Sequence, residues 1–273
     1  KQHPEIAMSK IKEPKYFSSC DLKLPQNGIG DNTVNTKVIT DENSYEKLFF
    51  GLNNYKAVGE ASSDYFYYYK NVIPRIKQKF GDIKIIVCLR NPVDRAFSAY
   101  NNLLRDSREY LPFNEALIAE EERTSKNWDW MWHYKKGGLY SKALENYQKE
   151  FTNVKVVLFD DLKLNTDMVL NDLFMFLGVK SNLKIDVSTK YSYSGKPKNS
   201  LISFLTNRKN PFVFFLREVV LRLMPRKYLE KVASKVFEKE TIDSDVQNYL
   251  KSFFKDDILK LQLLIKRDLK NWL

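Results

Sequence analysis

Two kinds of apolar pattern alternate along this chain. Short, nearly continuous apolar runs at residues 83–89 and 154–159 are typical of strands that are buried on both faces of a parallel sheet. Apolar residues at helical spacing follow or precede these runs, at 93–104, 141–151 and 165–177. Strands that alternate with helices favour right-handed parallel crossovers. We therefore predict an α/β fold with three layers, in which helices flank a parallel sheet.

The junction after the first of these strands reads L-R-N-P-V-D-R-A-F-S-A-Y. Asn91 can cap a helix, and Pro92 suits the first helical position. Arg90 then lies at the carboxyl end of a strand, where open α/β sheets bind ligands, and Ser98 lies nearly two turns into the helix. An anion at this junction would meet a guanidinium, a hydroxyl and a helix amino terminus. A strand–helix junction with an ordinary surface arginine fits the same residues.

This junction resembles the 3′-phosphate-binding motif of sulfotransferases that use 3′-phosphoadenosine-5′-phosphosulfate (PAPS). In that family the arginine and the serine of the motif hold the 3′-phosphate, and the matching residues here are Arg90 and Ser98. The resemblance extends from His3 to Trp272 and includes the segments G-E-A-S, G-x-Y and V-x-V-V-x-x-D-D-L. It implies an arrangement like that of a P-loop nucleotide kinase. It also implies transfer of a sulfuryl group from PAPS to a hydroxyl, with 3′-phosphoadenosine-5′-phosphate (PAP) as product.

The K-E-P segment at residues 12–14 resembles a segment of glycan sulfotransferases in which a glutamate is the general base. Glu13 is the matching residue, and because it precedes a proline we expect an extended backbone there. An exposed loop carboxylate is the alternative. Lys12 and Ser62 are expected to contact the acceptor, although Ser62 also suits a helix cap. Some glycan enzymes carry a catalytic lysine at the position of Ala61, so that role is absent here or filled elsewhere.

Sulfotransferases grip the 5′-phosphosulfate with a glycine- and threonine-rich loop that follows the first strand, and residues 1–273 contain no such loop. We therefore expect 1–273 to be a single sulfotransferase domain that lacks the first strand and this loop. In the family a basic loop near residue 196 closes over the nucleotide, so Lys196 and Lys198 are expected to approach the cofactor phosphates. Ordinary loop lysines are the alternative. The apolar stretch 211–224 is too short to span a bilayer and is expected to pack on the domain or to touch a membrane surface.

The net charge of +11 and the pI of about 9.3 suit an anionic partner. The lysines are scattered and belong to no recognised nucleic-acid-binding module, so we expect no specific nucleic-acid partner. With two cysteines and two histidines in the chain, we expect no metal site. Cys88 is expected to be a buried, inert small hydrophobe. No signal peptide or membrane-spanning run is visible, so we expect a cytoplasmic protein, with peripheral membrane contact as an option.

Aromatic residues gather near the middle of the chain, at Trp128, Trp130, Trp132 and Tyr134. Stacking of these side chains on sugar rings is one interpretation. Packing within the domain is the interpretation we favour for most of them, because large aromatic side chains contribute much of the buried area of a core.

These expectations combine into a sulfotransferase of bacterial and glycan-modifying type, with PAPS as donor, no metal, and a carbohydrate hydroxyl as acceptor. The K-E-P segment points to this class, and so does the absence of the R-K-G-x-x-G nucleotide motif. Two other functions fit parts of the sequence. One is a non-catalytic nucleotide- or carbohydrate-binding module, which the absence of the 5′-phosphosulfate loop favours. The other is a P-loop-fold kinase, which would need G-x-x-x-x-G-K-[ST] and a magnesium site.

Overall fold

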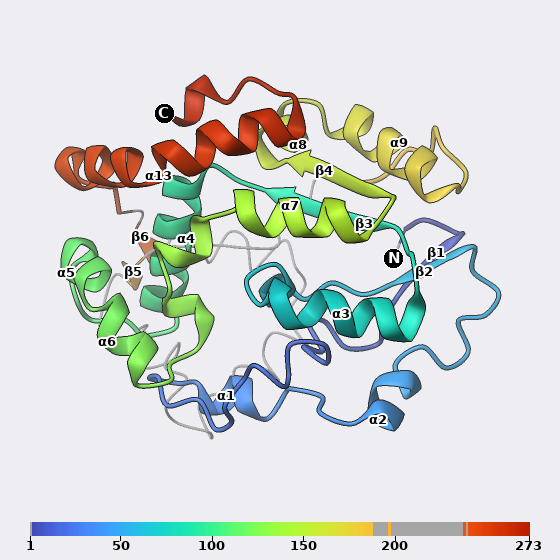
Figure 1. The fold of residues 1–273 in the computed structure, drawn as a ribbon, viewed down its shortest axis with the longest axis horizontal. Coiled ribbons are helices and arrows are strands. Elements are labelled where there is room, and N and C mark those ends of the chain that lie inside the picture. The colour runs from blue at the N-terminus through green and yellow to red at the C-terminus, as the bar shows by residue number, and fades with distance from the viewer. Residues whose placement is uncertain (1, 188–195, 198–236, 239) are drawn as a thin grey trace.

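The strands of this protein form parallel pairs, in a computed structural model that describes residues 2–187, 196–197, 237–238 and 240–273 (Figure 1). Strand β1 (Ile6–Met8) pairs with β2 (Ala57–Gly59), and β3 (Ile85–Leu89) pairs with β4 (Val154–Leu158). The β3–β4 pair confirms the expected parallel strands at 83–89 and 154–159. Within the described ranges, no hydrogen-bonded ladder joins one pair to the other.

Helices follow most of these strands. Their bounds are α1 Asn32–Asn35, α2 Glu42–Lys47, α3 Tyr69–Phe80, α4 Pro92–Arg105, α5 Phe113–Ile118, α6 Glu120–Ser125, α7 Ser141–Glu150, α8 Phe159–Leu164, α9 Thr166–Leu177 and α13 Ser244–Ile265. Single turns of 3₁₀ helix lie at Ser63–Tyr65, Trp130–Trp132, Lys136–Gly138 and Lys270–Trp272. Two short antiparallel strands, β5 (Lys196–Pro197) and β6 (Phe237–Glu238), complete the described elements.

The main core lies where α4, α7 and α13 meet the β3–β4 pair. Helices α3, α7 and α13 follow one another across the front of the molecule in Figure 1, and α7 contacts both of the others. Helix α13 buries Leu250, Phe254, Ile258 and Leu261, which recur at helical spacing along one face. The long last helix therefore closes the core over α4 and α7, and it holds the loop before α7 through Asp257, which accepts hydrogen bonds from Tyr140 N and Ser141 N.

Local capping explains where two of the predicted helices begin and end. Asn91 Oδ1 accepts a hydrogen bond from Val93 N at 2.9 Å, and Pro92 is the first residue of α4, as the sequence predicted. Helix α9 ends at Gly178, whose φ of 77° lies in the left-handed region that glycine adopts without a steric cost. The start of α4 and the end of α9 were thus predictable from one or two residues each.

Strand β3 differs from the expectation of a strand buried on both faces. Val87 and Leu89 are buried, but Ile86 is 43% exposed and Cys88 is exposed as well. Successive side chains of a strand point to opposite faces, so Val87 and Leu89 lie on one face of β3 and Ile86 and Cys88 lie on the other. The described helices cover the Val87 face and leave the Ile86 face open, and the prediction that Cys88 is buried was wrong.

Two helices begin or end at a tight turn. Helix α3 begins at Tyr69, and the 3₁₀ turn Ser63–Tyr65 that precedes it has no side-chain cap. Helix α13 ends at Ile265, where Lys266 adopts a left-handed φ of 52°.

Candidate functional site

The first part of the candidate site lies at the carboxyl ends of β3 and β4. Leu89 and Leu158 are the last paired residues of these strands, so Arg90 and Phe159 leave the sheet side by side. The Arg90 guanidinium lies over the Phe159 ring, 5.3 Å from its centroid. Its Nη2 is 3.8 Å from Asp94, and its Nε is buried with no hydrogen-bond partner among the described residues. The Arg90 guanidinium therefore lies at the edge of the sheet where ligands bind, with an N–H donor that no described residue accepts.

Helix α4 carries the other half of the predicted 3′-phosphate motif. Ser98 lies in the second turn of α4 and is partly buried, one short connection away from Arg90. Strand β5, which contains Lys196, contacts the same helix. Of the predicted cofactor residues, Arg90 therefore lies in the connection that leads into α4, Ser98 lies in α4, and Lys196 lies in the neighbouring β5. Lys198 and the apolar stretch 211–224 lie outside the described residues.

The second part of the site is the loop that contains Glu13. The Glu13 side chain is 37% exposed, and Lys12 Nζ lies 4.0 Å from its Oε1. Ile39 N donates to the carbonyl of Pro14, and Lys15 N donates to Ser62 Oγ at 3.1 Å. The structure thus brings the K-E-P segment and Ser62 together, as the predicted acceptor site requires. Ser62 does not cap a helix; its hydroxyl joins these two segments and donates to Glu60.

The backbone of this loop contradicts one prediction. Glu13 precedes a proline and was expected to be extended, but its φ is 54°, and that of Lys15 is 56°. Left-handed conformations of non-glycine residues cost about 1–3 kcal/mol each and persist only where the surroundings hold them. The hydrogen bonds from Ile39 N to the Pro14 carbonyl and from Lys15 N to Ser62 Oγ supply that support.

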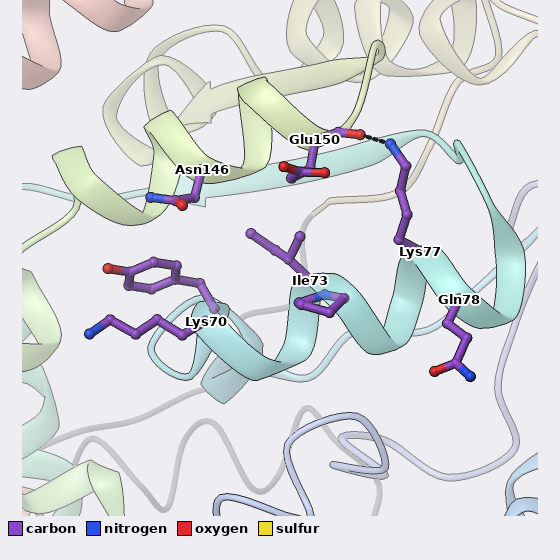
Figure 2. Close-up of a pocket in the computed structure, with 8 residues that line it drawn as sticks. Lys70, Ile73, Lys77, Gln78, Asn146 and Glu150 are labelled. Atoms are coloured by element: carbon purple, nitrogen blue, oxygen red, sulfur yellow. Dashed lines mark hydrogen bonds between the residues drawn. The ribbon is translucent and has the colours of Figure 1, made fainter.

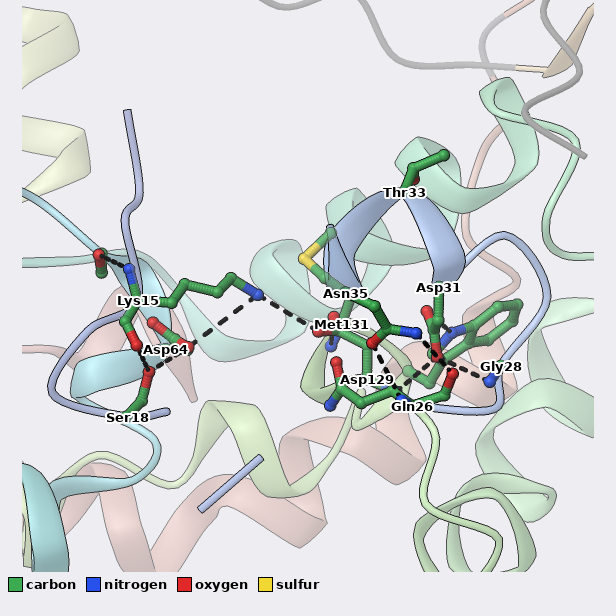
Figure 3. Close-up of polar contacts among 12 residues, drawn as sticks. Lys15, Ser18, Gln26, Gly28, Asp31, Thr33, Asn35, Asp64, Asp129 and Met131 are labelled. Atoms are coloured by element: carbon green, nitrogen blue, oxygen red, sulfur yellow. Dashed lines mark hydrogen bonds and ion pairs between the residues drawn. The ribbon is translucent and has the colours of Figure 1, made fainter. Parts of the chain in front are cut away.

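A buried charge cluster lies beneath the loop (Figure 3). Lys15 Nζ lies 3.3 Å from Asp129 Oδ2 and 4.0 Å from Asp64 Oδ2, and both aspartates are fully buried. Ser18 Oγ donates to Asp64 Oδ2 at 2.7 Å, while the buried Asp64 Oδ1 has no partner among the described residues. Burial raises the pKa of Asp64 to about 6, against the opposing effect of Lys15. Sequence analysis missed Lys15 and Asp129, which no motif marked.

A second buried network supports Asp129 from the other side. Asp31 Oδ2 accepts hydrogen bonds from Asp129 N at 2.9 Å and from Gly28 N at 2.7 Å, as Figure 3 shows. Arg108 forms an ion pair with Asp31 and donates to the carbonyl of Ile29. Burial raises the pKa of Asp31, and the Arg108 charge opposes that effect. The loop around residues 26–35 is thereby fixed to the segment that carries Asp129.

The aromatic residues near the middle of the chain are used mainly for packing. Trp130, Trp132 and Tyr134 are 8%, 0% and 0% exposed, which confirms the packing interpretation for these residues. His133 lies among them, and its Nδ1 is 2.7 Å from the Tyr67 hydroxyl. Burial, together with the charge of Lys136, lowers the pKa of His133 to about 4, so this imidazole is neutral at physiological pH.

One surface pocket lies apart from these residues. It measures about 470 Å³, lies between α3 and α7 (Figure 2), and is lined by Tyr69, Lys70, Ile73, Pro74, Lys77, Gln78, Asn146 and Glu150. Lys77 Nζ donates to the carbonyl of Glu150 across it. None of the predicted site residues lines this pocket, so it does not bear on the proposed chemistry.

Two kinds of feature are absent from the described part of the chain. No group of three or more histidine, cysteine, aspartate or glutamate side chains is placed to hold a metal ion there. No helix of the same residues has the length and apolar character needed to cross a membrane.

Comparisons with known proteins assign the chain to a family. The sulfotransferase domain family matches residues 71–259, which include the Arg90 junction, β4 and most of α13. The chain belongs to the sulfotransferase family. A crystal structure of a sulfotransferase from Alicyclobacillus acidocaldarius superimposes with a TM-score of 0.77 at 32% identity, over 99% of this chain and 90% of that one. These findings confirm the predicted family and its P-loop-like α/β fold.

Two human sulfotransferases are similar over a shorter segment. Heparan sulfate glucosamine 3-O-sulfotransferases 3B1 and 3A1 are each 32% identical over 126 residues, which is 45% of this chain. The matched segment spans about a third of their length, 31% and 30% respectively. The chain is thus similar in structure to the Alicyclobacillus sulfotransferase over nearly all of its residues, and similar in sequence to the two human sulfotransferases over less than half of them.

Proposed function

We propose that this sulfotransferase moves a sulfuryl group from PAPS to a hydroxyl of a carbohydrate. The observation that carries the proposal is the Arg90 guanidinium, which lies at the carboxyl end of β3 with a buried Nε that has no partner among the described residues. A buried donor without a partner is costly unless a ligand satisfies it. An anion such as a phosphate fits this donor, and the family match makes the 3′-phosphate of PAPS the natural choice.

In this proposal Arg90 binds the 3′-phosphate from the connection after β3 and Ser98 binds it from α4. Lys196, in β5, and Lys198 are proposed to approach the cofactor phosphates. The bound donor supplies an activated sulfuryl group with a good leaving group. No metal is required for this chemistry. PAP, which keeps the 3′-phosphate, is the product that stays in the site.

Glu13 is the proposed general base. Its partly exposed carboxylate takes the proton from the acceptor hydroxyl, which makes that oxygen nucleophilic for in-line attack on sulfur. Lys12, whose Nζ lies 4.0 Å from Glu13 Oε1, and Ser62, whose Oγ accepts a hydrogen bond from Lys15 N, are proposed to orient the acceptor. Cationic and backbone donors that meet the transferred group stabilise the negative charge on its oxygens.

A carbohydrate acceptor is supported by the human relatives, whose names give heparan sulfate glucosamine as their substrate. The experiment is a panel of saccharides, phenols and steroids assayed with ³⁵S-labelled PAPS. We expect label on saccharides only. Transfer confined to phenols or steroids would contradict the acceptor class, and phosphoryl transfer from ATP would favour a kinase. PAP binding without any transfer would favour a non-catalytic binding protein.

A further inference from the structure

We propose that Lys15 is a positioning residue for Glu13, and that it acts through its buried ion pairs with Asp129 and Asp64. This inference rests on the proposed function, because it assumes that Glu13 is the base. It assigns a specific task to a lysine that no sequence motif singles out.

Lys15 is held from three directions. Its N–H donates to Ser62 Oγ at 3.1 Å, and its Nζ donates to Asp129 Oδ2 at 3.3 Å. Its carbonyl oxygen lies 3.1 Å from Ser18 Oγ, whose single proton it shares with Asp64 Oδ2 at 2.7 Å. Its side chain is 9% exposed, so these contacts are shielded from water. Figure 3 shows the extended side chain reaching from the loop to both aspartates. A lysine spends considerable side-chain entropy when it is fixed in this way, so the arrangement is specific rather than incidental.

The groups that hold Lys15 are themselves fixed. Asp129 Oδ1 accepts from Met131 N at 2.9 Å, and Asp129 N donates to the buried Asp31. Asp64 Oδ2 accepts from Ser18 Oγ. The ammonium therefore docks on carboxylates that lie 49 and 114 residues away in sequence and that belong to the buried part of the domain. The Lys15 ion pairs thus hold the loop against the buried part of the domain.

Glu13 is the residue whose position these ion pairs restrain. Pro14 alone separates it from Lys15, and the proline ring fixes one of the two backbone torsions of that residue. Ile39 N donates to the Pro14 carbonyl at 3.0 Å, which restrains the same segment. Because Glu13 and Lys15 both have left-handed φ values, the turn relaxes once its contacts are lost. The direction of the Glu13 carboxylate therefore depends on the Lys15 ion pairs.

The cluster also carries an imbalance of charge that makes the lysine necessary. Asp64 and Asp129 are both fully buried, and Lys15 is the cation that pairs with them. Without that ammonium the two carboxylates repel each other, and a buried carboxylate without a partner is strongly disfavoured. Loss of the charge should therefore displace the loop rather than leave it in place.

The test is a double-mutant cycle between Lys15→Met and Glu13→Gln, with ³⁵S-labelled PAPS as donor and a heparan sulfate oligosaccharide as acceptor. We expect Lys15→Met to lower kcat at least tenfold with PAP affinity within about twofold of wild type, and to cause no further loss in the Glu13→Gln background. Lys15→Arg should restore most of the rate. Lys79→Met, which breaks the surface ion pairs to Glu42 and Glu46, is the matched control and should leave kcat unchanged.

Losses that multiply in the double variant would overturn the proposal, because Lys15 would then act independently of Glu13. If Glu13→Gln lowers kcat and Lys15→Met does not, only this inference fails; if Glu13→Gln has no effect, the proposed base fails as well. Should Lys15→Met not fold, Asp129→Asn removes the same ion pair and takes its place in the cycle. Hydrogen exchange of residues 13–18 gives a readout without turnover: wild-type protection in Lys15→Met would also overturn the proposal.

Discussion

The guanidinium of Arg90 lies 5.3 Å from the centre of the Phe159 ring, and the two residues directly follow the paired ends of β3 and β4. An arginine over an aromatic face gains about 0.5–1 kcal/mol at a partly exposed site. The contact also fixes the plane of the guanidinium, so its donors are oriented before a ligand arrives. The pairing of the two strands therefore places the cation of the site and the ring that supports it.

Replacement of Phe159 should weaken cofactor binding without abolishing it. We expect Phe159→Leu to reduce PAP affinity about two- to fivefold, which corresponds to the loss of one cation–π contact. Phe159→Tyr keeps the aromatic face and should bind PAP as the wild type does. Isothermal titration calorimetry with PAP measures both. Equal affinities for all three proteins would show that the ring does not support Arg90.

Glu13→Gln should impair turnover selectively. The substitution preserves size and hydrogen bonding but removes the basic oxygen, and general-base catalysis typically contributes about a hundred- to ten-thousandfold. We expect kcat to fall within that range while PAP affinity stays unchanged. Steady-state kinetics measures kcat, and calorimetry on the same preparation measures PAP affinity. If kcat remains within about threefold of wild type, Glu13 is not the base, and Asp64 becomes the next candidate.

The buried ion pair between Arg108 and Asp31 should matter for stability. Arg108 is 3% exposed and Asp31 is 0% exposed, so loss of the arginine leaves a carboxylate buried without its counter-charge. We expect Arg108→Met to lower the free energy of unfolding by about 3–5 kcal/mol. The control is Lys126→Met, which breaks an exposed pair with Glu122 and should cost at most about 0.5 kcal/mol.

Urea denaturation at pH 7 measures both changes. Similar small losses for Arg108→Met and Lys126→Met would mean that Asp31 finds compensation elsewhere in its network. The hydrogen bonds that Asp31 accepts from Gly28 N and Asp129 N would then stabilise its negative charge.

Two buried groups should give opposite contributions to the pH dependence of stability. Burial raises the pKa of Asp64 from about 3.8 to about 6, so the folded state binds this proton more tightly than the unfolded state does. The protonated Asp64 therefore contributes to the free energy of unfolding at low pH, and that contribution is lost as the pH rises from about 3.8 to about 6. Burial lowers the pKa of His133 from 6.5 to about 4, so the unfolded state binds the proton more tightly and stability rises with pH between those values. Between about pH 4 and 6 the two contributions oppose each other.

Single variants separate these contributions. Relative to wild type, Asp64→Asn should become progressively more stable as pH rises from 4 to 6, and His133→Gln should become progressively less stable over the same range. Urea denaturation at half-unit steps of pH measures the difference in free energy of unfolding. Differences that do not change with pH would contradict the assigned shifts.

The sequence predicted the parts of the fold that depend on local pattern. The apolar runs at β3 and β4 and the Asn91–Pro92 start of α4 were readable because each follows from a few adjacent residues. The open Ile86 face of β3 was not readable, since an apolar run looks the same whether one face is covered or two.

The candidate site was predicted where a motif marked it and missed where only contacts define it. Arg90 and Ser98 were recognised because the junction resembles the sulfotransferase 3′-phosphate motif, and the structure places Arg90 directly after β3 and Ser98 in the following helix. The Lys15–Asp129 pair joins residues 114 positions apart, and no periodicity or spacing connects them. The left-handed turn at Glu13 was also missed, because it is held by a hydrogen bond from Lys15 N to Ser62 Oγ.

The proposed binding of the cofactor's 3′-phosphate at the β3–α4 junction is tested most directly by calorimetry of Arg90→Ala with PAP and AMP. A charge-assisted hydrogen bond contributes about 1.5–3 kcal/mol, so we expect PAP binding to weaken about ten- to a hundredfold. AMP lacks the 3′-phosphate and should bind the variant nearly as it binds the wild type. Arg90→Lys keeps the charge but not the planar guanidinium, so its affinity for PAP should lie between those of the wild type and Arg90→Ala. Equal losses for PAP and AMP would contradict the claim.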